Sequence, residues 1–286
     1  MQELISKANT LLEALPYIQR FSGATFVVKY GGSFMDNPDE AVRTGVANDV
    51  VFLEAVEINP VVVHGGGKRI NKALEAADIE TRFVNGLRYT DSATVEVVDQ
   101  VLSKEVNGEI VEMINSLGGE AKGIAGTEIF TCQRHAPGGE DYGFVGEVIA
   151  VNTGPLEECI SKGITPVISP TARDEKGKIY NCNADIAAAQ TAIVLAAKRL
   201  VFMSDVPGLL RDPEDTETLI PHLDIKEVDK LKEAGIIAKG MIPKVDSAVS
   251  AIEAGVDKVS FVDGRINHAV LLEIFTDKGV GTEIVK

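Results

Sequence analysis

The sequence predicts an α/β protein with a mainly parallel central sheet and helices on both faces. Three observations support this prediction. Short apolar runs of strand length alternate along the chain with longer segments of helical periodicity. Two of the apolar runs end directly in glycine clusters, Gly31-Gly32 and Gly65-Gly66-Gly67. The length of 286 residues is enough for one large domain or two modest ones with a packed core.

The composition is that of a globular protein, with 45% hydrophobic and 25% charged residues. The net charge of −15 argues against a nucleic-acid or anionic-membrane partner, but a few local cations can still bind a small anionic substrate. No long apolar region opens the chain, and the apolar run at 186–197 is too short for a membrane helix. Three cysteines without a CxxC pair fit a reducing compartment. We therefore expect a cytoplasmic protein.

The first segment carries an apolar stripe at helical spacing, and Pro16 is expected to end this helix. The segment precedes the first strand, so the stripe packs either on its own domain or on another subunit. The stripe consists of Leu4, Ile5, Ala8, Leu11, Leu12 and Leu15.

Strands and helices then alternate to the end of the chain. Strands are expected where short apolar runs occur, at 25–30, 60–64, 165–169, 200–204 and 258–262. Helices are expected at 39–57, 68–77, 92–117, 184–197, 226–234, 243–254 and 269–275. The Gly-rich stretch 120–152 favours short antiparallel strands, and 175–178 is typical of a hairpin turn. In such a fold, ligands bind at the carboxyl ends of the strands, where the glycines lie.

The two glycine turns are suited to holding an anion. Glycine lets backbone N–H groups approach an anion closely, and a helix N-terminus behind the turn adds partial positive charge. Each turn taken alone can equally be a simple tight turn. No segment matches GxxxxGK[ST], which excludes a P-loop enzyme. Neither turn matches GxGxxG, which argues against a dinucleotide-binding oxidoreductase.

Four charged residues stand where a ligand would explain them. Lys29 lies inside an apolar strand, where a cation is costly unless it meets an anion or a carboxylate. Lys244 lies near a helix N-terminus, which disfavours cations unless phosphate is bound. Asp185 can orient both lysines or simply cap its helix. Arg88 suits bidentate carboxylate recognition or an internal ion pair. Both lysines can also be solvated surface residues.

Five ordered motifs resemble the amino-acid kinase family over nearly the whole chain. They are LPYIQRFSGATFVVKYGGSFM, VVVHGGGKRIN, RFVNGLRYTD, YNCNADIAAA and MSDVPGLL with the later KGMIPKV. Within the family they are similar to the kinases that phosphorylate N-acetyl-L-glutamate in the second step of arginine biosynthesis. The resemblance implies a three-layer α/β/α sandwich with an interlacing helix at 1–22. It also implies an acetylglutamate-binding, dimerising N-lobe at 23–196 and an ATP-binding C-lobe at 197–286 that carries an effector tail.

The resemblance also implies a role for each matched residue. Lys29 and Lys244 would stabilise the transferring phosphoryl group, and Asp185 would hold both lysines. Arg88 and Asn181 would hold the substrate's α-carboxylate. Gly32, Gly65 and Gly66 would donate backbone N–H groups to phosphate and to the substrate's reacting carboxylate. The nucleotide site would comprise Gly32, Asp205, Val206, Pro207, Gly208, Leu209, Leu210, Gly240 and Met241. The cofactors would be ATP and Mg²⁺, with the ion held through ATP.

The ends of the chain resemble the arginine-inhibited, hexameric branch of these kinases. This implies a homo-oligomer, either a dimer or a trimer of dimers, with a PII-type signal protein as a further candidate partner. Arginine would bind near Tyr17, Lys198, His268, Glu273, Gly279 and Gly281. Three departures from the family pattern remove none of the residues expected to be catalytic. They are Lys68 for a usual Pro, Ser33 for a common Asn, and Gly126-Thr127-Glu128 for Gly-Lys-Asp.

Three alternatives remain open at the level of the sequence. Another amino-acid kinase would act on glutamate or aspartate, but the Arg88 and Asn181 segments favour the acetylated substrate. A non-catalytic arginine sensor on the same fold is disfavoured by the presence of Lys29, Lys244 and Asp185. An oxidoreductase is disfavoured by the absent dinucleotide motif.

Overall fold

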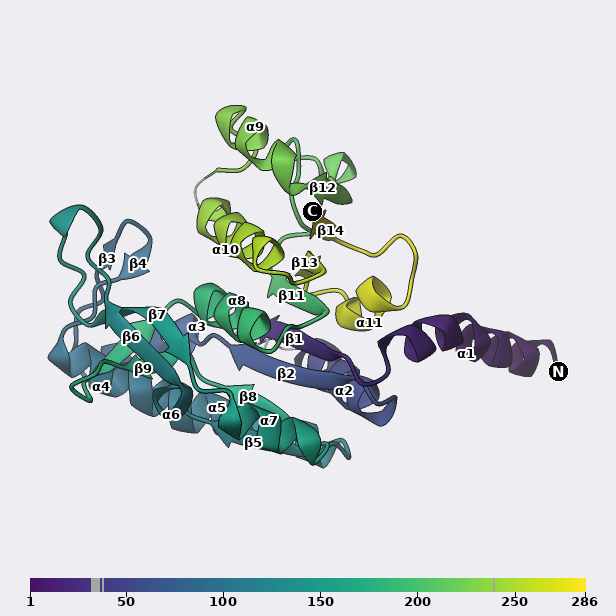
Figure 1. The fold of residues 1–286 in the computed structure, drawn as a ribbon, viewed down its shortest axis with the longest axis horizontal. Coiled ribbons are helices and arrows are strands. Elements are labelled where there is room, and N and C mark those ends of the chain that lie inside the picture. The colour runs from purple at the N-terminus through teal and green to yellow at the C-terminus, as the bar shows by residue number, and fades with distance from the viewer. Residues whose placement is uncertain (32–36, 38, 239) are drawn as a thin grey trace.

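A central sheet of eight strands organises the molecule, as a computed structural model shows (Figure 1). The structure describes all residues except 32–36, 38 and 239, and the side chains of residues 3 and 7. All neighbouring strands pair in parallel except β13 and β14. The strand order is β12 (His222–Asp224), β14 (Thr282–Val285), β13 (Lys258–Asp263), β11 (Arg199–Ser204), β1 (Thr25–Tyr30), β2 (Asn59–His64), β8 (Thr165–Ile168) and β5 (Ala121–Ile124).

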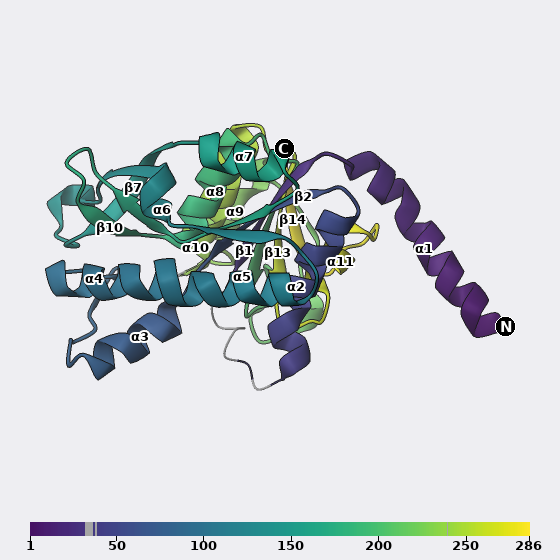
Figure 2. The same cartoon turned by 90° about the horizontal axis from the view of Figure 1, so that it is seen from below.

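Helices cover both faces of this sheet, which gives three layers (Figures 1 and 2). One face is packed by α2 (Glu40–Ala55), α3 (Gly67–Ala76), α4 (Ser92–Gln100), the π-helical segment η1 (Val101–Val106), α5 (Asn107–Ser116) and α11 (Ala269–Ile274). The other face is packed by α7 (Gly154–Ser161), α8 (Ala184–Val194), α9 (Val228–Glu233) and α10 (Met241–Glu253). The helix expected at 92–117 is formed by α4, η1 and α5, which follow one another as one continuous helix with a π-helical centre (Figure 2).

The strands send alternate side chains into the two helical layers. In β1, Phe26 and Val28 join one apolar core while Val27 joins the other, and all three are fully buried. A strand that is buried on both faces reads as a continuous apolar run, which is why the sequence revealed it. The fold class predicted from the sequence is confirmed.

A small four-stranded barrel stands beside the main sheet, where the Gly-rich stretch was expected to form short antiparallel strands. It consists of β6 (Phe130–Arg134), β7 (Val145–Val151), β9 (Thr171–Arg173) and β10 (Ile179–Cys182). The pairs β6–β7 and β9–β10 are antiparallel, as predicted, whereas β7–β10 and β6–β9 are parallel. The prediction of antiparallel strands is wrong for 121–124 of the Gly-rich stretch, because β5 pairs in parallel with β8 in the main sheet. The short connecting elements are the hairpin β3 (Phe83–Val84) and β4 (Leu87–Arg88), helix α6 (Gly126–Ile129), and 3₁₀ turns at Pro137–Gly139, Thr216–Thr218 and Ile225–Glu227.

The N-terminal helix α1 (Gln2–Phe21) continues past Pro16, so the prediction that Pro16 ends it is wrong. Its last turn is anchored by aromatic contacts of Tyr17 with Phe275 and of Phe21 with Phe26. These tertiary contacts hold the helix together where proline removes a backbone hydrogen bond.

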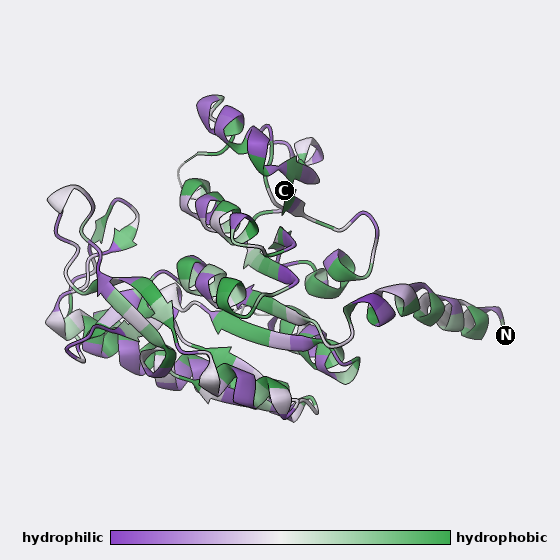
Figure 3. Cartoon of the chain, viewed as in Figure 1, coloured by the Kyte–Doolittle hydropathy of each residue, from purple (hydrophilic) through white to green (hydrophobic). Residues whose placement is uncertain are grey.

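The apolar stripe of α1 does not pack on its own subunit. The helix projects away from the body of the molecule, and green apolar positions run along it (Figure 3). Leu4, Leu11 and Leu12 are 63%, 70% and 63% exposed, so the alternative of packing on the same domain is excluded for them. Among the described residues, no helix has both the length and the apolar character to cross a membrane.

Two glycines provide a matched test of the packing. A Cβ at Gly126 would lie 2.1 Å from the carbonyl oxygen of Thr171, whereas a Cβ at Gly108 in α5 would meet nothing within 4 Å. We expect Gly126→Ala to lower the free energy of unfolding by about 1–3 kcal/mol. Gly108→Ala should raise it by about 0.5–1 kcal/mol, because alanine is the better helix former. Urea unfolding measures both, and a Gly126→Ala variant as stable as the wild type would contradict this packing.

Candidate active site

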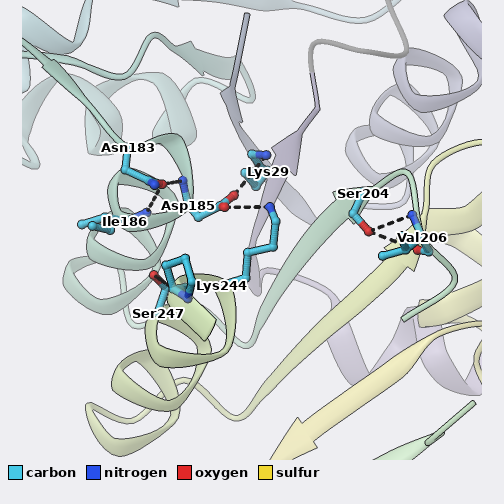
Figure 4. Close-up of polar contacts among 9 residues, drawn as sticks. Lys29, Asn183, Asp185, Ile186, Ser204, Val206, Lys244 and Ser247 are labelled. Carbon is cyan, nitrogen blue, oxygen red and sulfur yellow. Dashed lines mark hydrogen bonds and ion pairs between the residues drawn. The ribbon is translucent and has the colours of Figure 1, made fainter. Parts of the chain in front are cut away.

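A buried carboxylate at the start of α8 joins two lysines. Asn183 caps this helix, because its Oδ1 accepts hydrogen bonds from the backbone N–H groups of Asp185 (2.8 Å) and Ile186 (3.3 Å). Capping by Asn183 leaves the side chain of Asp185 free for other partners (Figure 4). Of the two interpretations from the sequence, the structure assigns capping to Asn183 and charge pairing to Asp185.

Each oxygen of Asp185 contacts one lysine (Figure 4). Lys29 Nζ, from β1, lies 3.0 Å from Oδ1, and Lys244 Nζ, from α10, lies 2.7 Å from Oδ2. The Lys244 contact is also a hydrogen bond, whereas the Lys29 contact is an ion pair without full hydrogen-bond geometry. The side chains of Lys29, Lys244 and Asp185 are 11%, 24% and 12% exposed. Neither lysine is therefore an ordinary solvated surface residue.

The electrostatics of this group favour an anionic ligand. Burial alone would raise the pKa of Asp185, but the attraction of Lys29 and Lys244 holds it below its usual value. Burial and the repulsion from Lys244 lower the pKa of Lys29, although Asp185 opposes this. Two cations share one carboxylate, so the group lacks one negative charge. An arriving anion supplies it.

A cavity of about 200 Å³ opens beside Lys29 and Asp185. It brings together residues that lie far apart in the sequence, and it includes five of the residues expected to bind substrate or phosphoryl: Lys29, Gly65, Gly66, Arg88 and Asn181. A larger cavity of about 460 Å³ between α4 and β10 contains none of these residues. The charged groups beside the smaller cavity favour it as the candidate active site.

Arg88 forms one wall of this cavity with an unused donor. Its Nη2 donates to Asn71 Oδ1 at 2.5 Å and to the carbonyl oxygen of Gly67 at 3.4 Å, and the guanidinium lies 5.0 Å from the ring centre of Phe83. Nη1 is buried and has no hydrogen-bond partner among the described residues. These partners are neutral, so the alternative of an internal ion pair is not seen in the described part of the chain. Burial also lowers the pKa of Arg88.

The glycine turn contributes backbone donors, but not all of its glycines are free. Gly65 N–H donates to the carbonyl oxygen of Tyr30 at 2.9 Å, within the pairing of β1 and β2. The N–H groups available to a ligand are therefore those of Gly66, which caps α3, and Gly67, which begins it. Of the two glycines of this turn expected from the family resemblance, Gly66 has an N–H group available to a ligand, whereas the N–H group of Gly65 is used in strand pairing. Gly32 lies outside the described residues.

Asn181 in β10 also faces this cavity and donates from Nδ2 to Thr90 Oγ1 at 3.2 Å.

The segment expected to bind the nucleotide begins directly after β11. Gly208 has φ of +147°, and a Cβ there would lie 2.5 Å from Thr282 Oγ1, so only glycine fits this turn. The next residue, Leu209, donates its N–H to Thr282 Oγ1 at 2.8 Å. Asp205 lies close enough to Lys29 for its charge to act on the lysine's pKa. Gly240 and Met241 stand at the N-terminus of α10, three to four residues before Lys244. The remaining residues expected at the nucleotide, Val206, Pro207 and Leu210, lie with Asp205 in the loop that follows β11.

The candidate effector residues are only partly gathered by the structure. Glu273 is buried and accepts hydrogen bonds from the N–H groups of Val280 (2.9 Å) and Gly281 (3.3 Å). The hydroxyl of Tyr17 donates to Asp277 in the same tail. Gly279 lies against the Glu273 carboxylate.

Two other members of the effector set have different partners. Lys198 pairs with Asp257 at 3.0 Å, and His268 Nδ1 lies 2.7 Å from Asp49 Oδ1.

Comparison with known proteins decides the family. A model of the amino acid kinase family matches residues 24–263. The chain belongs to the amino acid kinase family. Acetylglutamate kinases from Thermoanaerobacter sp. (strain X514) and Thermosynechococcus vestitus are 45% and 48% identical to it. The first alignment covers 99% of this chain and 94% of the relative, and the second covers 98% and 94%. This member of the family is a kinase.

Solved structures agree with this assignment. An N-acetylglutamate synthase from Neisseria gonorrhoeae, complexed with coenzyme A and N-acetyl-glutamate, has a TM-score of 0.86 and 26% identity. The alignment covers 98% of this chain and 63% of the synthase, so the synthase has a large part that this kinase does not match. A carbamate kinase from Giardia lamblia bound to AMP-PNP shares the fold, with a TM-score of 0.68, 14% identity, and coverage of 92% and 99%.

Three residues that support the cavity from behind were not predicted from the sequence. Asn71 accepts a hydrogen bond from Arg88, and Asn107 contacts His64 at the end of β2. His64 and Asn71 lie inside the motif VVVHGGGKRIN, where the glycines are the stronger signal. Asn107 is on the long helix, and nothing in its local sequence indicates that it reaches the end of β2.

The lowered pKa of Lys29 predicts an alkaline limb in the activity. We expect the cationic form of Lys29 to bind phosphate, so kcat/KM for ATP should fall as pH rises through this pKa, which lies below the usual lysine value. Lys29→Arg stays charged, so the limb should move to higher pH, although turnover at neutral pH falls because a guanidinium does not fit the ammonium's place. Lys226→Arg on the exposed surface is the matched control. Identical pH–rate profiles for the wild type and Lys29→Arg would exclude Lys29 as the titrating group.

Proposed function

We propose that this kinase transfers the γ-phosphoryl group of ATP to the side-chain carboxylate of N-acetyl-L-glutamate, which yields ADP and N-acetyl-L-glutamyl 5-phosphate. The observation that carries this proposal is the pair of lysines on Asp185, placed between the Arg88 cavity and the loop after β11. The names of the acetylglutamate kinases that are 45–48% identical support the choice of substrate.

The chemistry needs charge neutralisation more than proton transfer. Both substrates are anionic, and the attacking group is already a carboxylate, so no general base is required. Lys29 and Lys244 neutralise the phosphoryl oxygens as charge shifts between donor and acceptor, and Asp185 keeps both ammonium groups in place. A Mg²⁺ ion held by the phosphates of ATP would supply further positive charge there.

The acceptor is oriented by the opposite wall of the cavity. The free Nη1 of Arg88 and the amide of Asn181 receive the α-carboxylate end of N-acetyl-L-glutamate. The N–H groups of Gly66 and Gly67 then receive the reacting carboxylate. Holding the two reactants in line supplies a large part of the rate enhancement.

We also propose that different segments of the chain bind the two substrates. The described residues that line the cavity all lie between 29 and 185, whereas the nucleotide loop and Lys244 lie beyond 204. Residues 23–196 therefore bind acetylglutamate, residues 197–286 bind ATP, and residues 1–22 serve assembly.

A coupled ADP-release assay tests the reaction. N-acetyl-L-glutamate should support turnover, while glutamate and aspartate should not, because neither offers the acetyl group. Lys29→Ala and Lys244→Ala should each lower kcat about 10²–10³-fold, as expected for loss of one preorganised donor. Turnover with glutamate equal to that with N-acetyl-L-glutamate would overturn the substrate assignment.

The apolar stripe of α1 supports a homo-oligomer in which this helix packs on the same helix of another copy. Exposing each large apolar side chain is unfavourable by about 1.5–3 kcal/mol, so a partner surface is expected. We further propose that arginine binds near the base of α1 and inhibits the enzyme. A solved N-acetylglutamate synthase complexed with coenzyme A and L-arginine, 25% identical with a TM-score of 0.81, supports this ligand; the alignment covers 98% of this chain and 65% of the synthase.

Arg88 provides a test of substrate orientation. Arg88→Lys should raise KM for N-acetyl-L-glutamate at least about tenfold, because lysine cannot form a bidentate contact with a carboxylate. KM for ATP should change less than twofold. Arg134→Lys, on an exposed arginine, is the matched control. Steady-state kinetics with each substrate varied in turn measure both KM values. An equal rise in the KM for ATP would place Arg88 at the nucleotide instead.

Removing the α1 stripe tests the assembly. A chain without residues 1–15 keeps Lys29 and β1, so turnover should persist. Light scattering should show that a hexamer becomes dimers, and inhibition curves should show a weaker arginine response, since an effector acts by binding two states differently.

Leu11→Glu combined with Leu12→Glu should have the same effect as the deletion, whereas Thr10→Glu, outside the stripe, should not. Unchanged size and arginine response in the truncated protein would contradict the proposed interface.

A further inference from the structure

His64 is a fully buried histidine that the proposed reaction does not use as an acid or a base. It is the last residue of β2 and directly precedes the glycine turn of the cavity. Its ring has two polar contacts: Nδ1 lies 3.0 Å from the carbonyl oxygen of Gly65, and Nε2 lies 3.2 Å from Nδ2 of Asn107. Both contacts hold a ring that has no access to solvent.

These partners fix which ring nitrogen carries the proton. Asn107 Nδ2 also lies 2.8 Å from the carbonyl oxygen of Val167, which can only accept, so the amide nitrogen rather than its oxygen faces this region. Nε2 of His64 must then accept from Asn107. The Gly65 carbonyl oxygen can only accept as well, so Nδ1 of His64 must donate to it. Burial lowers the pKa of His64 to about 4, and the ring is neutral near pH 7.

The bond to Gly65 determines where the next N–H group points. The Gly65 carbonyl and the Gly66 N–H belong to one peptide unit, and in a trans peptide they point in opposite directions. Holding the carbonyl against His64 turns the Gly66 N–H away from the ring. Gly66 is also packed so closely against η1 that a Cβ there would lie 2.5 Å from Leu102 Cδ2. The peptide is therefore constrained from two sides.

We propose that His64 is a positioning residue whose Nδ1–H locks the Gly65–Gly66 peptide so that the Gly66 N–H donates to the reacting carboxylate. Asn107 in turn locks the ring of His64. This inference rests on the proposed function and names the residue that preorganises one of its donors. A donor that is already aligned stabilises the transition state without reorganisation, which is where such groups contribute most.

Two substitutions of His64 separate this role from simple packing. His64→Asn keeps an N–H donor near the position of Nδ1, whereas His64→Gln places its amide near the position of Nε2 and leaves the Gly65 carbonyl without its donor. We expect His64→Gln to lower kcat at least about tenfold, and His64→Asn to lower it no more than about threefold. KM for ATP should stay within about twofold in both variants, because the loop after β11 follows a strand that β1 separates from β2 in the sheet.

Thermal unfolding of both variants shows whether either result reflects lost folding. Equal losses of kcat in the two variants would overturn the positioning role and leave His64 as a packing residue.

A spectroscopic measurement on the unmodified protein tests the same point without activity. Nitrogen-15 chemical shifts of labelled histidine distinguish the protonated from the bare ring nitrogen, and the His64 signal is assigned by its loss in His64→Asn. We expect a neutral ring with its proton on Nδ1 at pH 7. A proton on Nε2, or a charged ring, would overturn the proposal whatever kcat the two variants show. Failure of the proposed substrate would appear only in the ADP-release assay and would leave this result unaffected.

Discussion

The whole site depends on one buried carboxylate that satisfies two ammonium groups. Without Asp185, Lys29 and Lys244 would face each other in a poorly solvated place, and their repulsion would drive them apart or deprotonate one of them. With it, each lysine is held near 3 Å from its own carboxylate oxygen. One lysine comes from the central strand and the other from a helix more than 200 residues later in the chain, so this ion pair also connects the two halves of the molecule.

The position of Asp185 follows from small side chains. Helix α8 buries Ala187, Ala188, Ala189 and Ala192 almost completely, and such short side chains let the helix lie close to the sheet and to α10. A close approach brings the first turn of α8 down to the level of Lys29. The Ala-rich composition of α8 therefore fixes how deep the Asp185 carboxylate lies.

The sequence predicted what local physics controls. The strand at 25–30 matched the structure residue for residue because it is buried on both faces, and the residue types of Lys29, Asp185 and Arg88 in apolar surroundings already indicated ligands. Tertiary contacts decided the rest. Helix α1 continues through Pro16 because aromatic residues anchor its last turn. Strand β14 is four residues long and is stabilised by its pairing with β12 and β13. No local sequence pattern indicates this pairing. The hydrogen bond from Gly65 to Tyr30 likewise depends on strand pairing, so the choice of free glycine donors needed the structure.

Pro16 lies where the projecting part of α1 meets the part that is anchored by Tyr17 and Phe21, so a change of direction there moves the whole projecting part. The fifteen residues before the proline extend about 22 Å at the helical rise of about 1.5 Å per residue. A rotation of about 10° at the proline would move the far end of the helix by about 4 Å, roughly three quarters of a helical turn of about 5.4 Å. A displacement of that size changes which side chains interdigitate between packed helices. A substitution at Pro16 that altered the direction of the projecting segment would therefore alter the geometry of the proposed assembly, although the apolar stripe itself would be unchanged.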